Sequence, residues 1–332
     1  MKDRITKPRA AAILGAVIIL FGAFNLGLYR LFTVRLGTNY SDVSQVKMVD
    51  VKRYLPFESG SELVKAETDF RLTDELPVLD GAAALVPVYA SVIHSVYPQG
   101  SVTYESGAFS DDNYYGENFA PDSKMQYRNT LRGYKAIVDG DCDVFFSAAP
   151  SQEQRQYAEE KGVELVYEPI GREAFVFFIN SKNPVDDLTR EQIRDIYCGK
   201  IKKWSEVGGA NRFINPITRV EGSGSQTVME AFMGDTPIAK KFPLSITGAS
   251  IGYSFRFYLS DMVGNENVKM LSLDGAYPDK EHIQNGSYPL VYPFYAVYRA
   301  DDPNPNVRKL VDWLLSAEGQ SLIESCGYTS IK

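Results

Sequence analysis

The sequence is poor in the residues that most metal sites, redox sites and disulfide frameworks require. Its 332 residues include two histidines and three cysteines. The cysteines, Cys142, Cys198 and Cys326, have no CxxC spacing, and their odd number cannot form a disulfide framework. Free cysteines are usually small buried residues, and a single disulfide stays open as an alternative if the domain is exported. We therefore expect no metal and no cofactor.

The charge balance indicates no dominant basic surface. There are 35 Lys and Arg residues against 42 Asp and Glu residues, and the formal net charge is −7. A nucleic-acid-binding protein needs a basic face to neutralise phosphates, so we expect no nucleic-acid partner. The hydrophobic fraction of 44% and the aromatic fraction of 12% favour a folded chain. The length suits two domains or one bilobed unit.

Four basic residues precede a long uncharged run at the N-terminus. The run extends from Ala10 to Tyr29 and ends at Arg30. At about 1.5 Å per residue, a helix over this run spans the ~30 Å hydrocarbon core of a bilayer. Positive charge before the run predicts a cytoplasmic tail at 1–9, a transmembrane helix at 10–29 and an extracellular remainder. A cleaved signal peptide, which would leave the protein secreted, and a buried soluble helix are the alternatives.

The rest of the chain alternates between strand-like and helix-like patterns. Residues 30–75 mix short apolar patches with Gly, Ser and charge, and they indicate a stalk and a packed arm. From Leu76 onward the alternation is typical of an α/β protein. We expect strands at 143–146, 174–179, 213–218 and 290–298, and helices at 189–198, 226–233 and 306–326, the last broken near Gly319.

The most informative segment is a loop rich in glycine and serine at 218–227, between an expected strand and an expected helix. Gly222 and Gly224 allow a tight turn and a close approach of the backbone to a ligand. Ser223 and Ser225 offer hydroxyl groups, and the first amides of the helix point to the same place with partial positive charge. A helix start of this kind binds a small oxyanion without a lysine cluster.

Two charged residues of the same loop strengthen this interpretation. Arg219 can make a bidentate contact with two oxygens of an anion, and Glu221 can hold that guanidinium in place. The alternative is an ordinary loop with N-capping serines and a surface arginine. The loop lacks the GxxxxGK[ST] pattern of a P-loop, and neither of its serines has the flanking glycines of a GxSxG nucleophile elbow. A serine hydrolase also needs a base, and His94 and His282 lie outside any motif, so we expect no enzyme.

Short segments in a fixed order carry a family resemblance. They are LDGAAALVPVY at 79–89, FSAAPS at 146–151, PIGREAF at 169–175, IRDIYCGK at 193–200 with WSEVGG at 204–209, RVEGSGSQT at 219–227 and IGYSF at 251–255. Together they resemble the solute-binding proteins of phosphate ABC transporters, in the Gram-positive branch of that family. The resemblance implies a bilobed type II periplasmic-binding-protein fold, with two α/β lobes joined by crossing strands and preceded here by the single transmembrane helix. Lobe 1 would comprise 76–170 and 290–332, and lobe 2 would comprise 171–289.

The resemblance also implies which groups face the anion. From the second lobe these are Arg219, Ser223, Gly224 and Ser225. From the first lobe they are the amides of the loop at 81–84, here Ala82 and Ala83, together with Thr130 at the next helix start and Ser147 after the next strand. Supporting roles fall to Glu221, Thr227 and Tyr253.

This sequence departs from the family pattern at two places. The first loop of the family offers a hydroxyl group, whereas this loop is alanine throughout. Relatives also have an aspartate that accepts the proton of hydrogen phosphate and thereby rejects sulfate, whereas here Ala148 follows Ser147. An unpaired buried polar group costs about 1–3 kcal/mol, so we expect discrimination between the two anions to weaken by about one to two decades.

The expected function is capture of inorganic phosphate, or a similar tetrahedral oxyanion, between the two lobes. The expected partners are the permease of an ABC importer and, through the N-terminal helix, the cell membrane. The alternative function is a membrane-tethered oxyanion sensor or interaction module that is not coupled to transport.

Overall fold

The structure, a computed structural model, describes residues 7–30, 49–104, 119–240, 249–264 and 267–331. Short helices other than α-helices carry the label η. In chain order the elements are α1 (Lys7–Arg30), η2 (Val51–Tyr54), β1 (Leu79–Gly81), η3 (Ala83–Leu85), α3 (Val86–Val96), α4 (Asn129–Asp139), β2 (Val144–Ser147), α5 (Gln152–Lys161), β3 (Leu165–Asn180), β4 (Asp187–Leu188), α6 (Arg190–Tyr197), η4 (Trp204–Val207), β5 (Ile214–Pro216), α7 (Gly224–Met233), β6 (Ala249–Phe255), η6 (Tyr258–Val263), β7 (Val268–Met270), β8 (Ser272–Leu273), α8 (Lys280–Gln284), β9 (Val291–Arg299), α9 (Pro305–Leu315) and α10 (Ala317–Ser325).

In the described part of the chain, the main sheet has seven strands in the order β1-β2-β9-β3-β6-β5, and β7 also pairs with β3. The outer pairs β1–β2 and β5–β6 are parallel, whereas β2–β9, β9–β3 and β3–β6 are antiparallel. A mixed sheet with helices between its strands is the architecture of an α/β protein. The expectation of an α/β fold is therefore confirmed.

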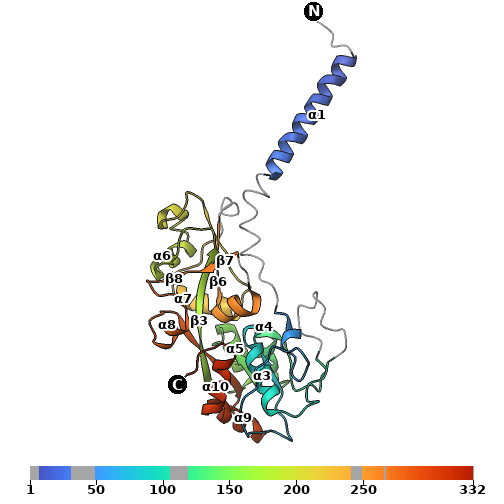
Figure 1. Cartoon of the computed structure of the whole chain (residues 1–332), viewed down its shortest axis with the longest axis vertical. Helices are drawn as coiled ribbons and strands as arrows, with labels where there is room; N and C mark the ends of the chain where they lie inside the picture. Colours follow the sequence, from blue (N-terminus) through green and yellow to red (C-terminus); the bar gives the residue numbers. More distant parts are fainter. Residues whose placement is uncertain (1–6, 31–48, 105–118, 241–248, 265–266, 332) are drawn as a thin grey trace, which may run out of the picture.

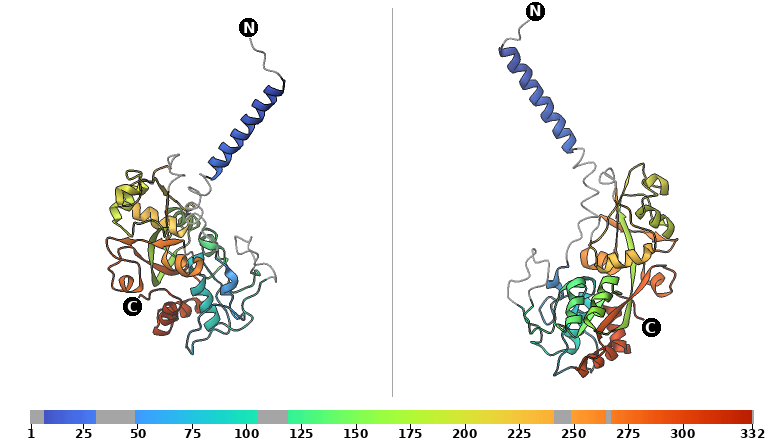
Figure 2. Two further views of the ribbon diagram at one scale, coloured as in Figure 1. Left: turned by 45° about the horizontal axis from the view of Figure 1, so that its top comes forward. Right: turned by 180° about the vertical axis from the view of Figure 1, so that it is seen from behind.

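The long strand β3 joins the two ends of this sheet. Its first part pairs with β9, from Leu165 opposite Arg299 to Ala174 opposite Val291. From Phe175 onward its partner is β6. In Figure 1, β3 runs from the region of α9 and α10 toward the region of α6 and β7, and the view from behind in Figure 2 shows the same path. One continuous strand thus connects the two halves of the fold.

The buried apolar residues form separate cores on the two sides of this strand. One cluster combines α3, α9 and α10 with β1, β2 and the arm at 49–72. A second combines α6 and α7 with β6 and the later part of β3. A smaller cluster joins α4 and α5 to β2 and β9. Phe255, at the end of β6, packs against both of the larger clusters. Each half therefore has its own core, and few side chains are shared.

Most of the expected elements are confirmed, with shifted boundaries. Thr189 caps α6 in a capping box with Gln192, as the spacing predicted. The expected strand at 174–179 is the second part of β3, which begins earlier, at Leu165. The predicted break near Gly319 is confirmed, a few residues earlier in the chain. The chain breaks at Ser316, which ends α9 and accepts a hydrogen bond from Gly319 N as the N-cap of α10. All three cysteines are free.

Helix α1 covers the uncharged N-terminal run. Its large apolar side chains between Leu14 and Leu26 are exposed, so they pack against none of the other elements that the structure describes. Counting only residues whose side chains the structure describes, none of the helices reaches the length and hydropathy needed to cross a membrane.

A buried glutamate lies where β3 changes partners, and it makes protein stability depend on pH. Glu173 is buried, and its Oε1 accepts a hydrogen bond from Ala174 N (2.8 Å). Burial raises the pKa of this carboxyl to about 7, from a usual value of 4.5. Between these two values the folded state keeps a proton that the unfolded chain has lost. Stability therefore falls as the pH rises through that window.

We predict that Glu173→Gln removes this dependence. Relative to the variant, the wild-type protein should lose stability as the pH rises from about 4.5 to about 7, by on the order of 3 kcal/mol in total. Urea unfolding of both proteins across this range measures the difference. If the difference between them does not change with pH, the carboxyl is not held protonated in the fold.

Candidate anion-binding site

The loop at 218–227 is built around the first turn of α7. Gly222 has a φ of 74°, a left-handed conformation that favours glycine, and it turns the chain into the helix. Ser223 is the N-cap of α7, and its Oγ accepts a hydrogen bond from Gln226 N (3.3 Å). The amides of Gly224 and Ser225 lie in the first turn, where a helix offers no carbonyl partner. They give the helix start its partial positive charge.

Buried polar groups hold the arginine of this loop. Arg219 N donates to Tyr253 Oη and to Gln226 Oε1, each at 3.1 Å, and the Tyr253 hydroxyl also donates to Gln226. Burial raises the pKa of Tyr253 to about 12, so the hydroxyl keeps its proton. The supporting role predicted for Tyr253 thus has a geometric basis. Gln226, whose side chain completes this arrangement, was missed because only the fold brings it beside Tyr253.

The Arg219 side chain reaches toward the other half of the protein. Its guanidinium lies close enough to Tyr258 of η6, a member of the cluster containing α3 and α9, to act on the ionisation of that hydroxyl. Burial raises the pKa of Tyr258, and the guanidinium opposes that rise. Glu221, the partner expected from the sequence, is exposed on the loop. Arg219 therefore extends from the α7 loop toward η6.

The start of α4 presents a second group of donors. Asn129, the first residue of α4, has a φ of 61°, and its Oδ1 accepts from Thr130 N at 2.7 Å. Thr130 Oγ1 and Ala83 N also donate to this oxygen, each at 3.4 Å. The predicted residues Thr130 and Ala83 are therefore brought together, and they share one acceptor.

The starts of α4 and α7 face each other. A Cβ on Gly224 would lie 4.0 Å from Thr130 Oγ1 and 3.8 Å from Phe255. A Cβ on Gly222 would lie 2.3 Å from Leu131 Cδ2, closer than carbon atoms approach. Glycine at 222 thus permits the two helix starts to meet, whereas a Cβ on Gly224 would make only ordinary contacts. Donors from segments almost a hundred residues apart in the sequence converge at one place.

The remaining predicted residues have local partners. Ala82 N donates to Phe146 O (2.8 Å), so this amide is already bonded within the fold. Ser147 is buried, and its hydroxyl donates to Ala148 O (2.9 Å). Thr227 Oγ1 donates to Ser223 O (3.1 Å), one turn back in α7. Of the two first-lobe amides expected from the sequence, Ala83 is the one next to Thr130.

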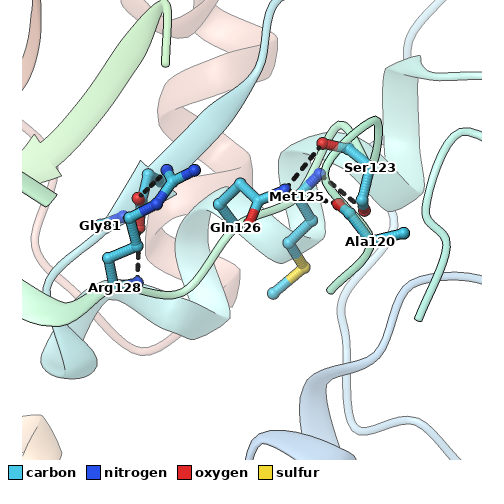
Figure 3. Close-up of polar contacts among 7 residues, drawn as sticks. Gly81, Ala120, Ser123, Met125, Gln126 and Arg128 are labelled. Atoms are coloured by element: carbon cyan, nitrogen blue, oxygen red, sulfur yellow. Dashed lines mark hydrogen bonds and ion pairs between the residues drawn. The ribbon is translucent and has the colours of Figure 1, made fainter. Parts of the chain in front are cut away.

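A buried ion pair fixes the position of the α4 start. Asp80, at the end of β1, is fully buried, and its Oδ2 accepts from Arg128 Nη1 (2.8 Å). Its Oδ1 accepts from Arg128 N (3.0 Å) and Gly81 N (2.8 Å). Figure 3 shows Arg128 reaching back to the strand end beside Gly81. Burial raises the pKa of Asp80, while Arg128 and these amides oppose the rise. The pair ties the residue before Asn129 to the loop that contains Ala83.

Two other features are not part of this site. A cavity of about 310 Å³ lies beside α6 and β5, and Thr218 is the residue of the 218–227 loop that lines it. Ser250 has the GxSxG spacing in the sequence, but it lies within β6, is fully buried and accepts a hydrogen bond from Asn215 Nδ2 (3.1 Å). A nucleophile elbow requires an exposed serine at a sharp strand-to-helix turn, so Ser250 is a core residue.

Comparison with solved structures places this arrangement in a known fold. A putative phosphate ABC transporter substrate-binding protein from Clostridium perfringens, solved with bound phosphate, aligns with a TM-score of 0.55 at 24% identity, over 76% of this chain and 98% of that one. An ABC-type phosphate transport receptor from Vibrio cholerae aligns with a TM-score of 0.51 at 17% identity, over 78% and 99% of the two chains. At these identities the likeness shows the fold.

Sequence comparison gives relatives of the same kind. A protein of Bacillus subtilis named phosphate-binding protein PstS is 24% identical over 232 residues, which are 66% of this chain and 75% of that protein. A protein of the same name from Staphylococcus epidermidis is 27% identical over 220 residues, or 60% and 67% of the two chains. A family model described as PBP superfamily domain matches residues 115–318, more than half of the chain. The family resemblance carried by the short segments is thus confirmed, and the chain belongs to the PBP superfamily.

Proposed function

We propose that the protein captures inorganic phosphate, or a related tetrahedral oxyanion, between the starts of α4 and α7. The observation that carries this proposal is the close approach of the two helix starts, where a Cβ on Gly224 would lie 4.0 Å from Thr130 Oγ1, together with Arg219 on the same loop as Gly224. A helix start offers uncompensated amides with partial positive charge, and the arginine adds a full charge. The relatives named as phosphate-binding proteins support phosphate as the ligand.

Capture requires that the two halves close around the anion. We place lobe 1 at 76–170 and 290–332 and lobe 2 at 171–289. The change of partner in β3 at Phe175 and the separate cores on its two sides support this division. Helix η6 is the exception, since its Tyr258 and Met262 pack in the core of lobe 1. Closure about such a connection excludes water and strengthens each charge-assisted hydrogen bond to the anion. Binding needs no covalent chemistry, and delivery to the permease of an ABC importer is the step that follows.

We predict that calorimetry on the full chain in detergent micelles detects phosphate and arsenate binding in the micromolar range or tighter. Because Ala148 has no carboxylate, sulfate should compete more strongly than at a site that has one.

Arg219→Ala should weaken phosphate binding about tenfold or more, since a hydrogen bond to a charged group contributes about 1.5–3 kcal/mol. Arg190→Ala, which breaks an exposed ion pair with Asp274, is the charge-matched control and should bind as the wild type does.

Two outcomes would contradict the proposal. The first is the absence of micromolar binding for phosphate, arsenate, sulfate and molybdate alike. The second is an unchanged phosphate affinity in the Arg219→Ala protein, because an arginine that faces the anion cannot be removed without loss.

A pair of tyrosine variants tests how the arginine is positioned. Tyr253→Phe and Tyr288→Phe each delete a buried hydroxyl, and the Tyr288 hydroxyl donates to Phe175 O (2.9 Å) in the same core. We expect both to lose about 1 kcal/mol of stability. Only Tyr253→Phe should also weaken phosphate binding, by about threefold or more, because Arg219 N loses one of its two acceptors. Equal affinities in the two variants would show that Tyr253 has no positioning role.

We further propose that residues 10–29 anchor the protein in the cell membrane, with 1–9 in the cytoplasm. The charge pattern of the sequence and the exposed apolar side chains of α1 support this, since a helix that is apolar all round requires apolar surroundings. Mass-spectrometric mapping of the N-terminus of the membrane-fraction protein should recover residues 1–30 intact. A mature N-terminus beyond residue 29, in protein released from the cell, would establish a cleaved signal instead.

A further inference from the structure

The Asn129 side chain occupies the donors that the first lobe offers to an anion. Its Oδ1 accepts from Thr130 N (2.7 Å), Thr130 Oγ1 (3.4 Å) and Ala83 N (3.4 Å). These donors come from two segments, η3 and α4. A single oxygen that accepts from a helix-start amide, a hydroxyl and a loop amide has the same bonding pattern as one oxygen of a bound oxyanion.

The backbone of Asn129 is adapted to this placement. Its φ of 61° is in the left-handed region, which asparagine tolerates better than most residues. The preceding residue, Arg128, is bonded to buried Asp80 through both its amide and its guanidinium (Figure 3). The Asn129 carboxamide is therefore held beside the α4 start by a buried support. Asn129 is itself partly exposed, so its side chain has room to turn away.

The chemistry of the two acceptors decides which one the donors prefer. An amide oxygen is neutral, whereas a phosphate oxygen carries charge, and charge-assisted hydrogen bonds are about twice as strong as neutral ones. Thr130 Oγ1 lies near the α7 start, 4.0 Å from where a Cβ on Gly224 would be, so an anion bound to the α7 amides can compete with the carboxamide for this hydroxyl. When only a fraction of the protein molecules is in the conformation that can bind, the apparent affinity is the intrinsic affinity multiplied by that fraction.

We propose that Asn129 is an internal competitor for the anion, a residue that lowers phosphate affinity by bonding to the first-lobe donors. This inference rests on the proposed function of the site and adds a residue that sets its affinity. Phosphate binding then involves an exchange in which Thr130 and Ala83 release Asn129 Oδ1 and bind an anion oxygen.

Two substitutions at this position give opposite predictions. Asn129→Gly deletes the competing oxygen, and glycine adopts the positive φ readily. Phosphate affinity should therefore rise by about two- to tenfold, which is the net contribution of one or two hydrogen bonds. Asn129→Asp puts a charged oxygen of nearly the same shape on the same donors and next to the anion, so affinity at pH 7 should fall by at least about tenfold. Calorimetry with inorganic phosphate on the full-length proteins measures both.

The control for the glycine variant is Glu75→Gly. Glu75 also has a positive φ, 43°, and its carbonyl accepts hydrogen bonds from Asn304 Nδ2 and Asn306 Nδ2 at the start of α9. This variant relieves a similar backbone conformation and should bind phosphate as the wild type does. Thermal melts of all the variants establish that each is folded at the temperature of the titration. Asn129→Asp is nearly isosteric with the wild type and keeps the test valid if the glycine variant does not fold.

The outcomes separate this inference from the function on which it rests. If neither wild type nor Asn129→Gly binds phosphate, the proposed function fails. If the wild type binds and Asn129→Gly binds no tighter, the competitor role alone is overturned. Weaker binding by both Asn129→Gly and Asn129→Asp would overturn it in favour of Asn129 as a ligand that donates from its Nδ2.

Discussion

The site depends on one geometric constraint, which is that two helix starts from different halves of the fold must meet. The protein has a net charge of −7, so its overall field opposes an anion. Attraction at the proposed site must then come from local groups, namely the amides of Gly224 and Ser225 at the α7 start and the guanidinium of Arg219. The glycine at 222 makes this approach possible, because a side chain there would collide with Leu131 and its φ of 74° favours glycine. Strand β3 pairs with β9 in one half and with β6 in the other, and so it joins the two halves in one sheet.

Buried polar side chains fix the donors on each side of this contact. On the α7 side, Tyr253 and Gln226 hold the backbone of Arg219. On the α4 side, Asp80 holds Arg128 and with it the residue that begins the helix. Burying such groups costs free energy, as the raised pKa of Asp80 shows. We infer that they are kept because they fix the positions of the two helix starts. The first-lobe loop needs no hydroxyl for this purpose, since the Ala83 amide lies next to Thr130 through their common acceptor.

The sequence predicted the parts of this arrangement that local patterns determine. The strand, loop and helix around 218–227 follow from glycine, serine and helical periodicity, and the capping box at Thr189 follows from residue spacing. The early start of β3 was missed because Glu168, Pro169 and Gly171 interrupt an apolar strand pattern, and the register does shift between Pro169 and Gly171. The break at Ser316 was placed slightly too late, near Gly319, because the apolar pattern continues across Ser316.

The roles of Gln226 and Asn129 could not be predicted, because each depends on contacts that only the fold creates.

The meeting of the α4 and α7 starts is the central claim. It is tested most directly by a crystal structure grown with arsenate, whose arsenic atom is located by anomalous scattering. The account predicts an arsenic peak between the two starts, with Thr130 and the amides of Gly224 and Ser225 within hydrogen-bond distance of the anion. A peak elsewhere, or an anion that contacts one helix start alone, would contradict it.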